Sequence, residues 1–186
     1  MNTGILLLAA GQSRRFGSDK RNALLPCGQT LLVRCGRHAL DSGMPVIVCL
    51  RMDDQQLAEQ LQSLGASTLL CPEADQGMGA TLAYGIGHVQ GWDSVLIALA
   101  DMPDIKPATF CKVAMAVHPG QICQPEHNGT PGHPVGFSSS YFTEIAGLGG
   151  DNGARNLVAR NRRALTRLPV DDPGILRDID RPTDLQ

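Results

Sequence analysis

The hydrophobic residues of this chain fall into short uninterrupted runs, separated by longer stretches in which apolar and polar residues alternate with helical spacing. Residues 4–9, 46–50, 67–70 and 95–100 form such runs. Runs of this kind are typical of parallel strands that are covered on both faces. We therefore expect these segments to form the centre of a mostly parallel β-sheet.

The stretches between the runs carry the start and stop signals of helices. The pattern predicts helices over residues 30–41, 53–64, 78–89 and 107–117. Glycines follow the first two, Asp53 can cap the first amides of the second, and Pro107 suits a first helical turn. The alternation of strands and helices indicates an α/β domain.

After about residue 119 this alternation stops. Residues 120–138 contain two extended pieces separated by "HNGTPG", whose Asn-Gly and Pro-Gly pairs form turns, so we expect a hairpin-like excursion that returns to the sheet. Asp151 is expected to cap a helix over residues 153–161, and a last strand is expected at 165–170. No repeat or linker interrupts the 186 residues, which predicts a single domain over residues 1–186.

Composition narrows the class of protein. A net charge of -2 predicts no general affinity for nucleic acid or for a membrane surface. The six cysteines include no Cys-x-x-Cys pair and several lie in apolar runs, which favours a reduced, cytoplasmic protein over a disulfide framework. No run approaches the roughly 20 apolar residues that a membrane span needs.

The loop after the first apolar run, "AAGQSRRFGSDK", combines small residues with basic ones. The small residues at 9–11 let a ligand approach the backbone, and Arg14, Arg15 and Lys20 could hold phosphates. The spacing matches neither the Walker A motif nor Gly-x-Gly-x-x-Gly. Taken alone, the composition of this loop favours an exposed basic surface over a phosphate site.

Carboxylates stand out in two later segments. "LIALADMPDI" places Asp101 and Asp104 after an apolar run, and ligands bind beyond the carboxyl ends of strands in open α/β sheets. Such carboxylates suit Mg²⁺, although capping of the next helix explains them equally well. "DIDRPTDL" places Asp178 and Asp180 where either could return to the sheet edge as a second metal ligand. Taken alone, this second segment is better explained as an exposed acidic tail.

Other chemistries find little support in the sequence. The histidines and cysteines between residues 111 and 133 match no zinc-ligand spacing, and Gly-x-Ser-x-Gly does not occur. His133 lies among turn formers, where a hydrogen bond within a loop is its default role.

Taken together, five segments resemble the MobA/MocA-like family of nucleotidyltransferases. "LLLAAGQSRRFGSDK" is similar to the signature loop of that family, "ALADMPDI" to its metal-binding strand end and "GTPGHPVGF" to its acceptor-side loop. "GGDNGARNLV" and "DIDRPTDL" are similar to its two closing elements, and the order of all five is that of the family. The resemblance implies a single-domain, Rossmann-like, three-layer α/β/α nucleotidyltransferase fold. It also implies transfer of a nucleoside monophosphate from an NTP to a phosphate on an acceptor, with release of pyrophosphate.

The resemblance also implies roles for individual residues. Arg15, Lys20 and Asp101 are the expected catalytic residues, and Asp101 and Asp180 are expected to hold Mg²⁺ or Mn²⁺. The expected nucleotide-binding residues are Leu8, Ala9, Ala10, Gly11, Ser13, Arg14, Gly77, Met78, Gly79 and Thr81. The expected acceptor-binding residues are His133, Pro134, Asp151 and Arg155.

Within the family, the Ala-Ala-Gly form of the signature loop is most similar to the type that uses CTP and molybdopterin, the molybdenum cofactor. That type implies docking to a molybdenum hydroxylase or its chaperone. Two alternatives stay open. One is a relative that uses GTP or another phosphorylated acceptor, such as a sugar 1-phosphate. The other is a catalytically silent accessory or binding protein for molybdenum enzymes, which the presence of Lys20, Asp101 and Asp180 disfavours.

Overall fold

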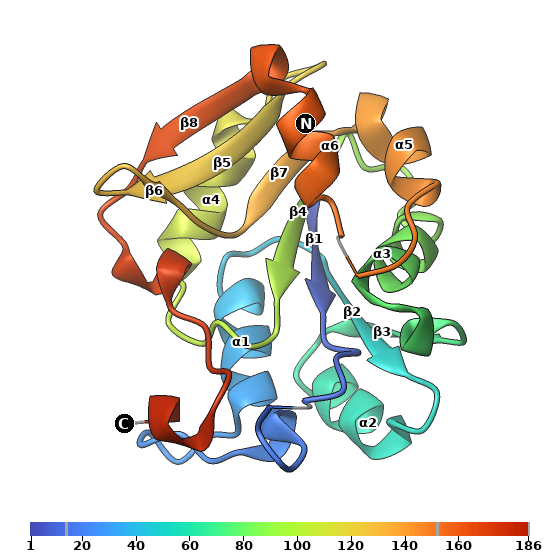
Figure 1. The fold of residues 1–186 in the computed structure, drawn as a ribbon, viewed down its shortest axis with the longest axis vertical. Helices are drawn as coiled ribbons and strands as arrows, with labels where there is room; N and C mark the ends of the chain where they lie inside the picture. Colours follow the sequence, from blue (N-terminus) through green and yellow to red (C-terminus); the bar gives the residue numbers. More distant parts are fainter. Residues whose placement is uncertain (14, 152, 186) are drawn as a thin grey trace.

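The computed structural model describes residues 1–13, 15–151 and 153–185 of the chain. Its centre is a sheet in which the strands expected from the apolar runs lie side by side (Figure 1). These strands are β1 (Thr3–Leu8), β2 (Val46–Arg51), β3 (Ser67–Cys71) and β4 (Ser94–Leu99). β1 pairs in parallel with both β2 and β4, and β3 pairs in parallel with β2. The expected parallel core of the sheet is therefore confirmed.

The second half of the chain extends this core with antiparallel pairings. The added strands are β5 (Ile122–His127), β6 (Thr130–Pro131), β7 (Val135–Ser138) and β8 (Leu165–Pro169). β7 lies between β4 and β5 and runs antiparallel to both, while β8 pairs in parallel with β5. β5 and β6 form a hairpin whose turn residues Asn128 and Gly129 have positive φ angles of 50° and 78°. The hairpin-like excursion expected near residues 120–138 thus forms part of the sheet, in the order β3-β2-β1-β4-β7-β5-β6.

Helices cover both faces of the sheet and complete three layers (Figure 1). One face carries α1 (Leu31–Leu40), α2 (Gln55–Ser63) and α4 (Pro107–Ala116), and the other carries α3 (Met78–Ile86), α5 (Phe142–Ala146) and α6 (Arg155–Arg160). Successive side chains of a strand point to opposite faces, so Ile5 and Leu7 pack under the first set while Leu6 packs under the second. The predicted α/β/α architecture is confirmed.

Short 3₁₀ helices shape the connections. They are η1 (Lys20–Asn22), η2 (Ala74–Gln76), η3 (Ser139–Tyr141), η4 (Arg162–Ala164), η5 (Pro173–Leu176) and η6 (Pro182–Leu185). Across the described residues, no helix combines the length and the apolar character that crossing a membrane requires.

The start of α2 differs from expectation. The helix begins at Gln55 and its N-cap is Asp54, one residue after the Asp53 that the sequence suggested. The Asp54 carboxylate makes no capping hydrogen bond, because it binds the guanidinium groups of Arg21 and Arg51 instead. A residue that looks like a local cap therefore joins two distant parts of the chain.

Two further helix boundaries differ as well. α3 ends at Ile86 with Gly87 as its C-cap, earlier than the predicted residue 89. The helix expected at 153–161 begins at Arg155 and has Ala154, not Asp151, at its N-cap. Asp151 instead lies against the start of α3, because Gly77 has no side chain to keep it away.

Candidate functional site

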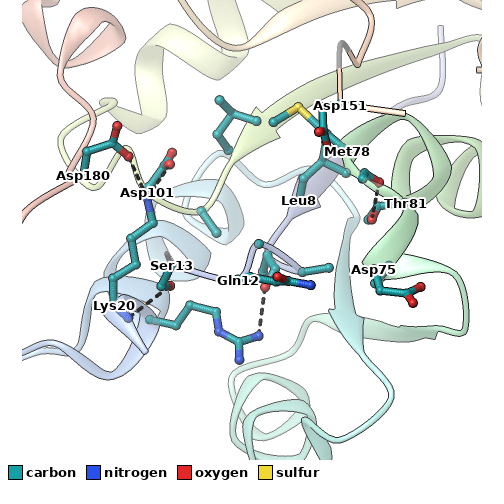
Figure 2. Close-up of a pocket in the computed structure, with 18 of the residues that line it drawn as sticks. Leu8, Gln12, Ser13, Lys20, Asp75, Met78, Thr81, Asp101, Asp151 and Asp180 are labelled. Carbon is teal, nitrogen blue, oxygen red and sulfur yellow. Dashed lines mark hydrogen bonds and ion pairs between the residues drawn. The ribbon is translucent and has the colours of Figure 1, made fainter. Parts of the chain in front are cut away.

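A cavity of about 380 Å³ opens at the carboxyl ends of β1 and β4 (Figure 2). The signature loop, the 3₁₀ helix η2, the start of α3, the segment after β4 and the C-terminal segment all contribute to its walls. Thirteen of the predicted site residues line it: Leu8, Ala9, Ala10, Gly11, Ser13, Arg15, Lys20, Gly77, Met78, Thr81, Asp101, Asp151 and Asp180. Arg14 lies outside the described residues.

One end of the cavity is built from charged side chains, and we call Arg15, Lys20, Asp101 and Asp180 the charged end. The Lys20 ammonium nitrogen lies 2.8 Å from Asp101 Oδ2 and 3.2 Å from Asp180 Oδ1 (Figure 2). Arg15 Nη1 lies 2.9 Å from Asp180 Oδ2. Three segments that are far apart in the sequence therefore converge on one cluster of two cations and two carboxylates.

The backbone holds these carboxylates in place. Ile179 donates a backbone hydrogen bond to the carbonyl of Asp101 at 2.8 Å, which ties the C-terminal segment to the end of β4. The carboxylate of Asp184 accepts from the backbone amides of Asp180 and Arg181 at 3.0 and 2.7 Å. Asp184 thereby fixes the turn that carries Asp180.

The opposite charges of this cluster stabilise the charged forms of Lys20 and Asp180. Burial on its own would lower the pKa of Lys20, but the carboxylates of Asp101 and Asp180 outweigh it and raise that pKa. Burial would raise the pKa of Asp180, and hydrogen bonds from Lys20 and Arg15 reverse this and lower it. At neutral pH, Lys20 is therefore a cation and Asp180 an anion.

The two carboxylates fit a divalent metal ion. Asp101 Oδ1 is buried and has no hydrogen-bond partner within the described part of the chain, although Oδ2 of the same carboxylate binds Lys20. An unpaired buried oxygen is costly, and Mg²⁺ prefers oxygen ligands. No cluster of three or more His, Cys, Asp or Glu side chains that could hold a metal occurs among residues 1–13, 15–151 and 153–185. Mg²⁺ commonly takes one or two carboxylates together with substrate phosphates and water, which is the share that Asp101 and Asp180 can supply.

The signature loop gives the cavity its floor. A Cβ atom on Gly11 would meet nothing within 4 Å, so a ligand can approach this backbone closely. Ser13 has a positive φ of 50°, its hydroxyl accepts from the amide of Lys20 at 3.2 Å, and its carbonyl accepts from the amide of Phe16 at 2.9 Å. Ser13 therefore shapes the loop that presents Lys20 to the carboxylates.

A buried ion network lies behind this loop, and the sequence pattern did not predict it. Arg21 is 3% exposed and pairs with the carboxylates of Asp19 and Asp54, and Arg51 also contacts both of these carboxylates. Burial would lower the pKa of Arg21, but hydrogen bonds to Asp19 and Asp54 raise it, so Arg21 is charged. The only sequence signal was an arginine in the segment "DKRNALL" that carries the loop into α1.

The opposite end of the cavity is built from backbone, and we call Gly77, Gly79, Gly150 and Asp151 the glycine end. The amide of Gly79 donates to the carbonyl of Gly150 at 2.7 Å. A Cβ on Gly77, whose φ is 111°, would lie 2.5 Å from Asp151 Oδ1, and a Cβ on Gly79 would lie 2.6 Å from the carbonyl oxygen of Gly149. Only glycine at these positions allows residues 149–151 to rest directly on the start of α3.

The remaining predicted residues lie outside the cavity wall. Gly79 belongs to the glycine end without lining the cavity, His133 and Pro134 lie just before β7, and Arg155 begins α6 with an exposed side chain. His133 is tied by its amide to the carbonyl of Ile175 at 3.1 Å. Burial lowers the pKa of His133, and the nearby charges of Asp101 and Asp178 only partly oppose this, so the imidazole is neutral at pH 7. The predicted contact of Gly79 with the nucleotide, and those of His133, Pro134 and Arg155 with an acceptor, stay predictions.

Comparisons with known proteins identify the family of the chain. The family model described as "MobA-like NTP transferase domain" matches residues 5–165. Purine catabolism protein PucB of Bacillus subtilis (strain 168) is 29% identical over 191 residues, which cover 95% of this chain and 91% of that protein. The molybdenum cofactor cytidylyltransferase of Escherichia coli (strain K12) is 27% identical over 186 residues, which cover 96% and 91%.

A solved structure shares the whole fold. Rv0371c from Mycobacterium tuberculosis H37Rv superposes with a TM-score of 0.84 at 26% identity, covering 99% of this chain and 95% of that one. The same protein has been crystallised in complex with manganese, and that structure matches with a TM-score of 0.78.

Proposed function

Because the chain belongs to the MobA-like NTP transferase family, we propose that it transfers CMP from CTP to the phosphate of molybdopterin and releases pyrophosphate. The observation that carries the proposal is the charged end, where Lys20 and Arg15 stand against Asp101 and Asp180 in one cavity with the signature loop. A site for a metal–nucleotide complex needs this combination, since cations meet phosphates and carboxylates meet the metal.

The reaction needs positioning and charge neutralisation more than a strong base. Both the acceptor phosphate and the α-phosphate of the nucleotide are anionic, and they must meet in line. Among the described residues that line the cavity, no nucleophile is paired with a base, which suits direct attack by the acceptor phosphate. The amides of Ala10 and Gly11 bind the nucleotide, and Arg15 and Lys20 stabilise charge on the departing pyrophosphate.

Asp101 and Asp180 would hold the metal ion. Mg²⁺ or Mn²⁺ supplies Lewis-acid neutralisation at the α-phosphate when it is bound. Lys20 occupies these carboxylates in the structure, so binding of the nucleotide lets Lys20 and Arg15 exchange carboxylate oxygens for phosphate oxygens. The site keeps its charges compensated before and after this exchange.

Different residues would contact the base of the nucleotide and the acceptor. Gly77, Met78 and Thr81 line the glycine end, where the base would lie, and the Ala-Ala-Gly form of the signature loop, which is most similar to the type that uses CTP, favours cytosine over guanine. His133, Pro134, Asp151 and Arg155 would face the acceptor, with Arg155 as partner of the anionic pterin phosphate. The relative named molybdenum cofactor cytidylyltransferase supports this choice of substrates, and the product would pass to a molybdenum hydroxylase or its chaperone.

Pyrophosphate release tests the proposal directly. The full chain is incubated with Mg²⁺ and molybdopterin, and with CTP, GTP or ATP in turn. We expect release with CTP at a rate at least tenfold above that with GTP or ATP.

The other outcomes each decide between alternatives. A preference for GTP would assign guanylyl transfer. Release with CTP only when a sugar 1-phosphate replaces molybdopterin would change the acceptor. No release with any nucleotide or acceptor would favour a silent accessory protein.

A further inference from the structure

Arg21 follows the loop lysine directly, and although it contributes to the cavity wall, its side chain is almost completely buried. Arginine carries five N–H donors, and here each of them has an acceptor. Nε donates to Asp19 Oδ1 at 2.8 Å and Nη2 donates to Asp19 Oδ2 at 2.5 Å and to Asp54 Oδ1 at 2.7 Å. Nη1 donates to Asp54 Oδ2 and, at 2.9 Å, to the backbone carbonyl of Ala9. The last of these bonds differs from the others because it ends on the backbone of the cavity floor.

The contact with Ala9 controls the orientation of one peptide unit. The peptide between Ala9 and Ala10 is planar and trans, so its C=O and N–H point in opposite directions. Arg21 holds the C=O, and the N–H of Ala10 therefore points away from Arg21. This amide donates no hydrogen bond to the described residues, and Ala10 lines the cavity. An unpaired amide in a fixed orientation is suited to a ligand oxygen.

We propose that Arg21 is a positioning residue, which holds the Ala9–Ala10 peptide so that the Ala10 amide is ready to bind the nucleotide. The proposal rests on the proposed function, because it assigns that amide to a nucleotide. Asp19 and Asp54 bind the same guanidinium and so help to hold Arg21 in place. Asp54 comes from the segment after β2, so it anchors Arg21 to the sheet, while Asp19 anchors it to the end of the loop.

Arg51 offers a matched control for this role. Its guanidinium contacts the same two carboxylates, at 3.1 Å from Asp19 Oδ2 and 3.2 Å from Asp54 Oδ1. It makes no hydrogen bond to the carbonyl of Ala9 within the described residues. Removal of either arginine takes one positive charge from the network, but only removal of Arg21 releases the peptide.

The experiment measures nucleotide affinity by isothermal titration calorimetry with Mg²⁺ and CTP, GTP or ATP, together with thermal melting. The variants are Arg21→Met, Arg21→Lys, Arg51→Met and Arg51→Lys in the full chain. We expect both Arg21 variants to bind the preferred nucleotide about tenfold more weakly than the parent chain, since one amide loses its orientation. Both Arg51 variants should stay within about threefold, even where their melting temperatures fall.

The lysine variants separate positioning from stability. Arg21→Lys would keep the charge beside Asp54, but an ammonium has three N–H donors on one nitrogen and cannot replace the five bonds that the planar guanidinium makes to Asp19, Asp54 and the carbonyl of Ala9. A tenfold loss of affinity in a well-folded Arg21→Lys chain supports the inference. Parent-like affinity in that variant, or an equal loss in the Arg51 variants, overturns it.

Two further outcomes are also decisive. If neither Arg21 variant folds, then Arg21 is required for folding and the positioning role is rejected. If the parent chain binds none of the three nucleotides, the proposed function itself fails, which is a different result from a parent chain that binds while the variants bind equally well.

Discussion

The two ends of the cavity hold their shape by different means. The charged end consists of side chains that bind one another, so each ion pair can be exchanged for a bond to a substrate phosphate or a metal ion. The glycine end consists mainly of backbone that rests on backbone, with the Asp151 side chain against Gly77, and among its described residues it contains no ion pair that a substrate could exchange. The difference suggests a division of labour, in which the charged end carries the chemistry and the glycine end fixes the shape that receives the base.

Removal of a charge from the charged end should have the largest effect. We expect Asp101→Asn to lower pyrophosphate release on the order of 10³-fold, because the site loses a metal ligand whose charge helps to hold Mg²⁺. The melting temperature should change little, since Lys20 keeps its bonds to Asp180 and to the carbonyl of Ile179.

The neighbouring Asp104→Asn serves as the control for this variant. Asp104 belongs to the same segment, but its carboxylate pairs with Arg177 at 2.7 Å and lies outside the cavity. Its turnover should stay within about twofold of the parent. Near-normal turnover in Asp101→Asn would remove Asp101 from the metal site.

Loss of the Lys20 cation should have two opposite effects. In Lys20→Met, turnover should fall about 10²-fold because the pyrophosphate loses a partner. Binding of Mn²⁺ without nucleotide, measured by electron paramagnetic resonance, should become roughly tenfold tighter, since an ammonium no longer competes for Asp101 and Asp180. Lys106→Met is the control, because Lys106 binds the carbonyl of Asp171 away from the cavity. Unchanged Mn²⁺ affinity in Lys20→Met would show that Lys20 does not compete with the metal.

A side chain at the glycine end should affect binding more than chemistry. A Cβ at position 79 would lie 2.6 Å from the carbonyl oxygen of Gly149, so Gly79→Ala must push residues 149–151 away from α3. We expect KM for the nucleotide to rise about tenfold, kcat to change less than threefold, and the free energy of unfolding to fall by about 1–3 kcal/mol.

Gly87→Ala, at the other end of α3, is the matched control. A Cβ at this C-cap would lie 3.4 Å from the carbonyl of Tyr84, and its φ of -63° suits any residue. KM should stay near that of the parent. An equal rise in KM in both variants would mean that α3 as a whole, and not the contact with residues 149–151, determines nucleotide binding.

The sequence predicts the features of the cavity that depend on local patterns, and it does not predict those that depend on contacts between residues far apart in the chain. The strands were predictable because a run such as residues 4–9 must be buried on both faces wherever it lies. Asp101 and Asp180 were predictable as partners only through the family resemblance, since 79 residues separate them. The places of Asp54 and Asp151 could not be predicted. Asp151 looks like the cap of the helix that follows it, and Asp54 stands beside the expected cap Asp53. In the structure Asp54 binds Arg21 and Asp151 lies against Gly77, and local propensity does not report such contacts.

Arg21 shows the same limit most clearly. An arginine beside a lysine in a basic loop is most simply read as exposed. Its burial depends on two carboxylates, one of them 33 residues away, and on a carbonyl 12 residues before it. Only the folded sheet brings these acceptors together.

The free energy of unfolding should depend on pH through the ion network behind the charged end but not through the glycine end. We expect this to be the smallest of the predicted effects. Burial would raise the pKa of Asp54, but hydrogen bonds from Arg21 and from the amide of Arg51 lower it below the ordinary value of 3.8. Between these two pKa values the unfolded chain binds more protons than the folded one, so the stability from Asp54 is complete above pH 3.8 and is lost as the pH falls through the folded value.

Asp54→Asn should therefore lower the free energy of unfolding at pH 6 by about 1–3 kcal/mol and flatten its fall below pH 3.8, as measured by urea denaturation over pH 2–6. Asp53→Asn, whose side chain is 80% exposed, should leave both the value and the slope unchanged. Gly79→Ala should lower the free energy equally at every pH, because it disturbs a contact between backbone groups that do not titrate. If Gly79→Ala and Asp54→Asn gave the same pH profile, the ion network behind the charged end and the glycine end would not be held by different forces.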